Sequence, residues 1–220
     1  MGRIIAIDGL AGSGKSSTAR EVSKRINYVY IDTGAMYRAV TLLTIEKKID
    51  INDTEAISKI AKNLAIEFKW IKGEHHTFLG NKDVSKEIRT KEVASLVSPV
   101  SVIPAVREHL ASLQRKLGKT DNIVMEGRDI GTNVFPNADL KFFMIADVRV
   151  RAQRRIADYQ KVGQKISLEE IIKVIDERDR IDSSREHSPL KKASDAIEID
   201  TTALNFEEQV AKIIEIIQYG

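Results

Sequence analysis

The chain has 220 residues, of which 42% are hydrophobic and 30% are charged, so it is too apolar for a disordered protein and too charged for a membrane-embedded one. Its 35 lysines and arginines exceed its 32 aspartates and glutamates by only three, which argues against a strongly basic nucleic-acid-binding module. The absence of cysteine excludes disulfides, thiolate metal sites and a cysteine nucleophile.

The first predicted strand, residues 4–7, runs directly into a glycine-rich loop. Residues 9–16 satisfy the pattern G-x-x-x-x-G-K-[ST] between this strand and a helix predicted over 14–26. Backbone N–H groups of such a loop turn inward around phosphate oxygens, and the helix N-terminus adds its positive end. We expect Lys15 to contact the β- and γ-phosphates of a nucleoside triphosphate and the Ser16 hydroxyl to ligate Mg²⁺. The residues expected to hold the nucleotide are Gly9, Gly12, Ser13, Gly14, Lys15, Ser16 and Ser17.

The second predicted strand, residues 28–31, is followed by Asp32-Thr33-Gly34-Ala35-Met36-Tyr37-Arg38. In an open α/β sheet this segment lies at the carboxyl edge, beside the phosphate loop. The Thr33 hydroxyl and the Arg38 guanidinium are suited to bind a second anion there. The alternative is a turn and a helix cap before a helix predicted over 35–48.

Residues 65–85 interrupt the alternation of strands and helices. Strand-like segments at 65–70 and 77–79 are separated by Lys72-Gly73 and followed by turn residues, which predicts a small antiparallel insert. Helices are predicted after the insert, over 91–97 and 102–117.

A charged segment, Glu126-Gly127-Arg128-Asp129, follows the predicted strand 123–125. A glycine at the end of a strand indicates a backbone that approaches another group closely. The segment therefore brings an arginine and two carboxylates to the same sheet edge. A surface ion pair between Arg128 and Asp129 is the alternative interpretation.

The helix predicted over 148–162, after a strand at 142–145, begins with an arginine cluster. Positive charge in a first turn opposes the helix dipole, and an approaching triphosphate would compensate for it. We therefore predict a mobile basic lid over about 149–166. A solvated basic face is an equally weighted alternative, because residues 161–165 are predicted to be solvated. The arginines of this cluster are Arg149, Arg151, Arg154 and Arg155.

The helix predicted over 168–182 carries a stripe that changes from apolar to charged along its length. Ile171 and Ile175 are followed at helical spacing by Arg178, Asp182 and Arg185, so the stripe is expected to leave the core and enter a cleft. A salt bridge between Arg178 and Asp182 within the helix is the alternative, and both interpretations are compatible.

The chain ends with a strand predicted over 196–199 and a helix predicted over 206–218, so that strands alternate with helices throughout. This order predicts an α/β fold: a parallel P-loop NTPase-type sheet covered by helices on both faces, with the antiparallel insert and the helical lid. Two helices begin with capping boxes, at Ser167 with Glu170 and at Asn205 with Glu208.

We expect one domain over residues 1–220, comprising a core (about 1–64 and 86–220), the insert (about 65–85) and the lid. No apolar run approaches the roughly 18 residues of a membrane span, and no targeting segment is recognised. We therefore expect a cytoplasmic protein without a membrane partner. The net charge of only +3 disfavours a nucleic-acid partner, and we expect a monomer.

Together these segments resemble the bacterial cytidylate kinase family along essentially the whole chain. Further anchors of the resemblance are residues 84–93, 97–101, 106–108, 126–136 and 178–185. Such enzymes transfer the γ-phosphoryl group of ATP to CMP or dCMP. The resemblance implies a clamp on the CMP phosphate (Thr33, Arg38, Arg128, Arg185), contacts to the sugar (Arg178, Asp182), readers of cytosine (Ser98, Arg107, Asp129) and catalytic cations (Lys15, Arg128, Arg185, Arg151, Arg155).

The chemistry of the implied substrates agrees with these roles. Cytosine offers a donor at N4, which a carboxylate accepts, whereas uracil would present an acceptor to it. The acceptor phosphate has a second pKa of about 6, so no general base is required at neutral pH. Two alternatives stay open: another small P-loop kinase of a nucleotide or metabolite, and a nucleic-acid-binding ATPase.

Overall fold

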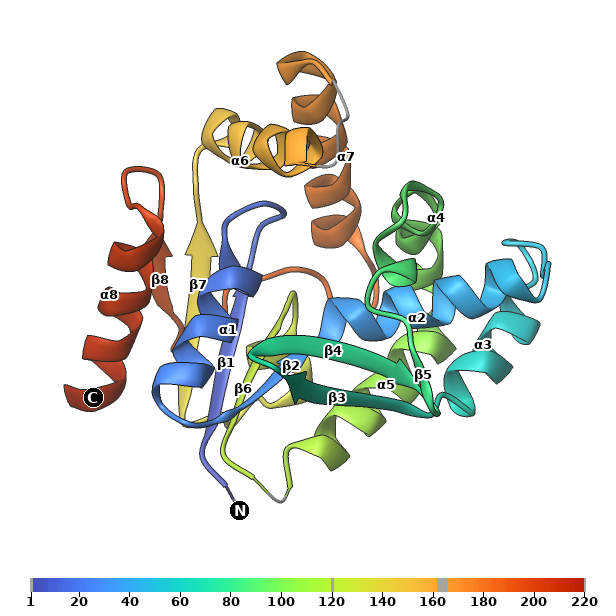
Figure 1. The fold of residues 1–220 in the computed structure, drawn as a ribbon, viewed down its shortest axis with the longest axis horizontal. Coiled ribbons are helices and arrows are strands. Elements are labelled where there is room, and N and C mark those ends of the chain that lie inside the picture. Colours follow the sequence, from blue (N-terminus) through green and yellow to red (C-terminus); the bar gives the residue numbers. More distant parts are fainter. Residues whose placement is uncertain (1, 120, 162–165, 220) are drawn as a thin grey trace. The chain divides into compact units, whose positions relative to one another are not determined.

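The computed structural model describes residues 2–119, 121–161 and 166–219, which fold into two compact units (Figure 1). The first unit comprises residues 1–30 and 118–220, and the second comprises residues 31–117. Residues 162–165, which belong to the predicted lid, lie outside the described residues.

A five-stranded parallel sheet, in the order β2-β6-β1-β7-β8, organises the first unit. The central strand β1 pairs with β6 on one side, where Ile7 lies opposite Glu126, and with β7 on the other, where Gly9 lies opposite Met144. Every residue of β1 is buried, as its continuous apolar run predicts. The strands are β1 (Ile4–Gly9), β2 (Val29–Asp32), β6 (Ile123–Gly127), β7 (Leu140–Ile145) and β8 (Ile197–Asp200).

Two helices cover one face of this sheet. Val22 of the first helix and Ile213 of the last are fully buried in one apolar cluster with Ile7 and Phe142 of the strands. A second helix pair packs on its own small cluster around Ala152. The helices are α1 (Lys15–Arg25) and α8 (Phe206–Tyr219) on the sheet, and α6 (Val148–Lys161) and α7 (Leu168–Ser184) in the second pair; a π-helical turn, η2 (Ile130–Val134), follows β6.

The second unit combines helices with a three-stranded antiparallel sheet in the order β3-β4-β5, as predicted for the insert. Apolar residues of its helices, among them Met36, Ile57 and Leu110, form its core. The elements are α2 (Thr33–Glu46), α3 (Thr54–Lys62), β3 (Ile66–Ile71), β4 (Glu74–Leu79), β5 (Lys82–Asp83), a 3-10 turn η1 (Glu87–Arg89), α4 (Lys91–Val102) and α5 (Pro104–Leu117).

Three helical predictions differ from the structure. The helix predicted over 102–117 begins only at Pro104, because the residue before a proline is driven out of the helical region and Ile103 is extended. The helix predicted over 91–97 continues instead to Val102. Helix α3 was not predicted, although Asp53 caps it by accepting the N–H of Ala56 at 2.9 Å.

The predicted α/β fold class is confirmed, and so are both capping boxes. Ser167 accepts the N–H of Glu170 at 3.2 Å, while Asn205 accepts the N–H of Glu208 at 3.0 Å. Among the residues that the structure describes, no helix has both the length and the apolar character needed to cross a membrane.

Candidate active site

The glycine-rich loop lies at the carboxyl end of β1, as predicted, and leads into α1. Gly9 is required by a close approach: a Cβ there would lie 2.2 Å from the Met144 carbonyl oxygen. Gly14 precedes α1 in the left-handed conformation. The loop therefore ends at the N-terminus of α1. The first backbone N–H groups of the helix have no partner within the helix there, and the positive end of its dipole faces the loop.

Lys15, the first residue of α1, is buried and donates from Nζ to the Leu10 carbonyl oxygen at 3.1 Å. Burial and the nearby positive charges of Arg128 and Arg178 together lower the pKa of Lys15 to about 7, although the carboxylates of Glu126 and Asp182 oppose the shift. An anion in the loop would reverse this effect, because it would stabilise the protonated amine.

Ser16 of α1 donates its hydroxyl hydrogen to Oε1 of Glu126 on β6 at 2.7 Å. These two oxygen-bearing side chains suit Mg²⁺, which is commonly bound by one or two protein oxygens together with water and substrate phosphates. Within the described residues, no group of three histidine, aspartate or glutamate side chains forms a metal cluster.

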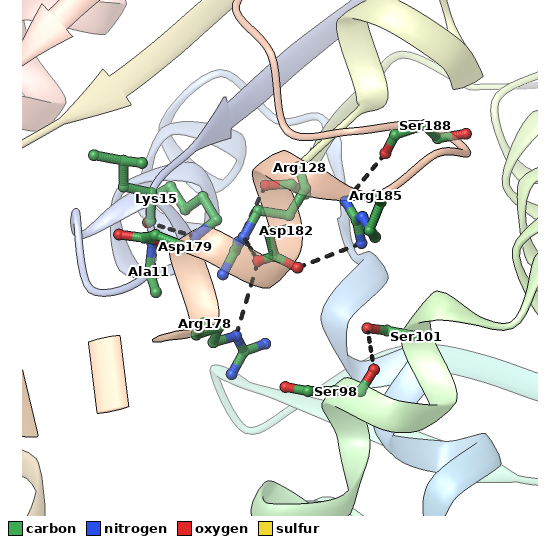
Figure 2. A network of polar contacts seen from close by, with 12 residues as sticks. Ala11, Lys15, Ser98, Ser101, Arg128, Arg178, Asp179, Asp182, Arg185 and Ser188 are labelled. Carbon is green, nitrogen blue, oxygen red and sulfur yellow. Dashed lines mark hydrogen bonds and ion pairs between the residues drawn. The ribbon is translucent and has the colours of Figure 1, made fainter. Parts of the chain in front are cut away.

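Three arginines surround the carboxylate of Asp182 on α7, and Figure 2 shows them converging on it. Arg128 Nε donates to Asp182 Oδ2 at 2.8 Å, Arg185 Nη1 lies 3.4 Å from Oδ1, and Arg178 Nε lies 4.0 Å from Oδ2. The predicted salt bridge within the helix is therefore present, together with two further arginines. We call these four residues the Asp182 cluster.

The charged side chains of the Asp182 cluster shift one another's pKa values. Burial alone would raise the pKa of Asp182, but Arg128, Arg178 and Arg185 hold it below its ordinary value. Burial would likewise lower the pKa of Arg128, whereas the carboxylates of Asp182 and Glu126 raise it above the ordinary value. All three arginines stay charged, so the cluster carries more positive than negative charge.

The segment after β6 is held by hydrogen bonds to a side chain of the neighbouring strand β1. Asp8 of β1 accepts the N–H of Ile130 at 2.9 Å and that of Gly131 at 2.8 Å, directly after Asp129. Burial raises the pKa of Asp8 to about 7, although these two backbone hydrogen bonds oppose the shift. Asp129 itself is buried and accepts from Asn133 Nδ2 at 3.1 Å.

The arginines that open α6 have different environments. Arg151 is buried, and its guanidinium donates to the carbonyl oxygens of Ala146 and Ala11 at 2.9 and 3.0 Å. Arg154 donates to the carbonyl oxygen of Thr201 at 2.6 Å, whereas Arg155 is exposed. Part of the predicted basic lid thus contacts the phosphate loop through its backbone oxygens.

A second group of charges lies in the other unit, around Asp32. Its carboxylate accepts the N–H of Ala35 at 2.8 Å and therefore caps α2, and it accepts from Arg38 Nη2 at 2.9 Å. Arg89 Nη2 lies 3.6 Å from the same carboxylate. Burial would raise the pKa of Asp32, but Arg38 and Arg89 hold it below the ordinary value. Thr33 is buried at the start of α2.

Two predicted base-reading residues lie in the second unit on α4 and α5. Arg107 is buried, donates to the Ser101 carbonyl oxygen at 3.1 Å, and lies over the ring of Tyr37 at 5.5 Å. Ser98 is half-buried, and its carbonyl oxygen accepts from the Ser101 hydroxyl at 2.9 Å.

The structure therefore groups the predicted residues by unit. The first unit brings together Lys15 and the Asp182 cluster, and the second brings Arg38 next to Asp32 and Arg107 next to Ser101. Sequence analysis assigned no role to several side chains that contact these residues. A charged residue at the end of an apolar strand was a usable signal for Asp8, and helical spacing from Asp182 was one for Asp179. The overlooked residues are Asp8, Arg89 and Asp179, whereas Asp32, Glu126 and Arg154 lie in segments that the sequence analysis had singled out without giving each an individual role.

Comparison with known proteins identifies a family and a fold. A family model described as cytidylate kinase matches residues 5–219. The cytidylate kinase of Acholeplasma laidlawii is 51% identical over 214 residues, 97% of this chain and 94% of that protein, and the one of Bacillus cereus is 47% identical over 213 residues, 97% and 95% of the two chains. Shikimate kinase from Bacteroides thetaiotaomicron has a similar fold, with a TM-score of 0.51 at 13% identity over 98% of each chain.

Proposed function

The chain belongs to the cytidylate kinase family, and on this premise we propose that it transfers the γ-phosphoryl group of ATP to CMP or dCMP, giving CDP or dCDP. The observation that carries the chemistry is the Asp182 cluster beside Lys15 in the first unit. Transfer between two nucleotides requires two anions to come together, and a surplus of buried positive charge stabilises that arrangement.

ATP is the phosphoryl donor in this proposal, and its phosphates bind to the loop of residues 9–17. The Ser13 hydroxyl is buried in the loop and, within the described residues, has no hydrogen-bond partner, so a phosphate oxygen would satisfy it. Lys15 becomes fully protonated as the triphosphate binds and stabilises its charge.

Mg²⁺ would be held by the Ser16 hydroxyl together with phosphate oxygens, with Glu126 within hydrogen-bond distance of that hydroxyl. When bound, the ion neutralises charge on the β- and γ-phosphates. Glu126 orients the Ser16 side chain toward this role, because its carboxylate accepts the hydroxyl hydrogen.

The acceptor nucleotide binds through arginines in this proposal. Arg128 and Arg185 bind the CMP phosphate, and we propose the same role for Thr33 and Arg38. The Nε of Arg38 is buried and has no hydrogen-bond partner in the described part of the chain, which supports an anion as its ligand. Arg178 and Asp182 contact the sugar.

Cytosine is read by Asp129, Arg107 and Ser98. A carboxylate accepts the N4 amino hydrogen of cytosine and repels the O4 oxygen of uracil, while an arginine donates to N3 and O2. Asp129 is suited to this role because the turn after it is held by Asp8.

Catalysis proceeds by positioning and charge neutralisation. The CMP phosphate is mostly a dianion at neutral pH and attacks without a general base. Lys15, Arg128 and Arg185 stabilise the charge that redistributes over the transferring group. We propose that Arg151 and Arg155 contribute from the lid over about 149–166. The cytoplasmic location, the monomeric state, and the absence of nucleic-acid and membrane partners stay predictions from the sequence.

An acceptor panel tests the proposal. Release of ADP is measured with CMP, dCMP, UMP and AMP for the wild type, Lys15→Ala and Asp129→Ala, with the exposed Lys24→Ala and Asp176→Ala as matched controls. We expect turnover with CMP and dCMP, a loss of roughly 10³-fold or more in Lys15→Ala, and weaker discrimination against UMP in Asp129→Ala. Absence of acceptor-dependent ADP release would contradict the activity, and unchanged discrimination would contradict the role of Asp129.

A further inference from the structure

In the last two turns of helix α7, Asp179 and Asp182 lie one turn apart, and the proposed function uses only Asp182. The other, Asp179, is directed toward the phosphate loop, where its Oδ1 accepts the N–H of Ala11 at 2.9 Å (Figure 2). Its Oδ2 accepts from Arg151 Nη1 of α6. Asp179 thus links the loop to an arginine of the predicted lid.

Both backbone polar groups of Ala11, which belong to two adjacent peptide units, are hydrogen-bonded by side chains. While Asp179 accepts its N–H, Arg151 Nη1 donates to its carbonyl oxygen at 3.0 Å. Arg151 is anchored in turn, because its Nε donates to the carbonyl oxygen of Ala146 at 2.9 Å and its side chain is only 5% exposed. A buried arginine that is hydrogen-bonded through both Nε and Nη1 has little freedom to release the backbone that it holds.

The backbone around Ala11 is also confined by contact with α6. Gly12 has a φ of +77°, and a Cβ at this position would lie 3.2 Å from Arg151 Cβ and 3.3 Å from the Arg151 carbonyl oxygen. The loop therefore follows the surface of α6 so closely that a side chain would not fit without displacement. Helices α6 and α7 pack on each other through Ala152, Ile171 and Ile175, so Asp179 and Arg151 act from one packed pair.

We propose that Asp179 is a positioning residue for ATP: by holding the Ala11 peptide and Arg151, it sets the phosphate loop in its binding conformation and couples that loop to α6 and α7. This inference rests on the proposed function, in which the loop binds ATP. Since Asp182, one turn away, serves the acceptor arginines instead, a change at Asp179 affects the donor nucleotide selectively.

The decisive variant is Asp179→Asn, which keeps the shape and removes the charge. The side-chain oxygen of an asparagine can still accept the Ala11 N–H. Its NH₂ group, however, would face the N–H donor of Arg151, so the hydrogen bond to Arg151 is lost. We expect the KM for ATP and the Kd of ATP measured calorimetrically without acceptor to rise about tenfold, by the loss of a charged hydrogen bond, while the KM for CMP changes less than about twofold. The matched control is Asp176→Asn, an exposed aspartate on the same helix, which should leave all three constants unchanged.

A wild-type Kd for ATP in a folded Asp179→Asn protein would overturn the inference, as would equal increases in both KM values. Thermal unfolding establishes whether the variant is folded. If it is not, the test uses Asp179→Glu, which retains the charge. In this variant the KM for ATP should rise more than the KM for CMP, although less than in Asp179→Asn. A wild-type ratio of the two KM values in Asp179→Glu would then overturn the inference. Failure of the proposed function is distinguishable, because a wild type that binds ATP but does not phosphorylate CMP contradicts the acceptor and leaves the role of Asp179 intact.

Discussion

Two buried aspartates, one in each unit, are surrounded by arginines, and they differ in what else holds them. Asp182 of α7 is contacted by Arg128, Arg178 and Arg185. Asp32 is contacted by Arg38 and Arg89, and it also caps α2 by accepting a backbone N–H. The carboxylate of Asp32 therefore has a structural partner apart from its arginines, whereas the carboxylate of Asp182 is held by arginines.

The arginines at the two aspartates also differ in how far their positive charge is exposed to water. Arg128 and Arg185 have side chains that are 16% and 5% exposed, whereas Arg89 is 61% exposed and well solvated. Water screens the charge of an exposed arginine, but a buried one depends on its partner or on a bound anion. The Asp182 cluster is thus more sensitive to loss of its carboxylate and gains more from a bound phosphate.

Of the changes that compare the two aspartates, Asp182→Asn is expected to have the largest effect. This change leaves buried arginines without their counter-ion, so we expect the free energy of unfolding to fall by about 3 kcal/mol and kcat/KM for CMP to fall by roughly 10²-fold or more. Urea unfolding and steady-state kinetics measure the two quantities. Addition of CMP should recover part of the lost stability, because its phosphate replaces the missing charge. Stability and kinetics close to the wild type would refute the special status of this cluster.

Asp32→Asn is the matched change in the second unit, and its effect should be smaller. The amide oxygen of asparagine still accepts the Ala35 N–H, and the exposed Arg89 is solvated, so we expect a loss of about 1 kcal/mol and an increase of about tenfold in the KM for CMP. The same two measurements apply. If Asp32→Asn lowered the free energy of unfolding as much as Asp182→Asn, the Asp182 cluster would not be the more sensitive of the two sites.

A third prediction concerns pH and the amine that faces the Asp182 cluster. The pKa of Lys15 lies below its ordinary value, at about 7, so between about pH 7 and 10.5 the folded state binds fewer protons than the unfolded state. The contribution of Lys15 to stability therefore falls as the pH drops through this window. Bound ATP raises the pKa again, so binding at pH 8 should take up a proton and weaken as the pH rises.

Calorimetric titration of ATP in two buffers of different ionisation enthalpy measures this proton uptake. Lys15→Arg is the control, because a guanidinium keeps its proton throughout the range and the uptake should vanish. Equal binding enthalpies in both buffers for the wild type would show that Lys15 is already protonated in the free protein.

The smallest effect is expected at the first turn of α7, far from its charged end. Ser167→Ala removes the capping hydrogen bond to Glu170, which should lower the free energy of unfolding by about 1 kcal/mol without altering the KM for CMP or ATP. Asn205→Ala removes the corresponding bond of α8 and is the matched variant. An altered KM in Ser167→Ala would mean that α7 transmits local changes to the Asp182 cluster.

Much of the fold was predictable because its signals are local. The loop before α1, the buried strands and the two capping boxes depend on residues within a few positions of one another. Proline acts equally locally, yet Pro104 was overlooked inside an apolar helical pattern that continued across it. Helix α3 was missed because its nine residues are short for a pattern of period 3.6.

The candidate site was predictable only in part. Sequence motifs selected Lys15, Arg128 and Asp182 as residues of one site, and local spacing even indicated the pair of Arg178 with Asp182. The backbone groups that Asp8 and Asp179 hold lie more than 100 residues away along the chain, and Arg151, the other partner of Asp179, lies on a different helix, so no local pattern could assign them.

The sequence by itself determined the backbone conformations and the types of charged group, since glycine, proline and capping residues act through neighbouring dihedral angles and hydrogen bonds. Only the tertiary structure decided which carboxylate holds which arginine, that Asp182 serves three of them, and that Asp179 holds the Ala11 peptide. Electrostatic and hydrogen-bond energies depend on distance and burial in space, and those are settled when α7 packs near the loop after β1.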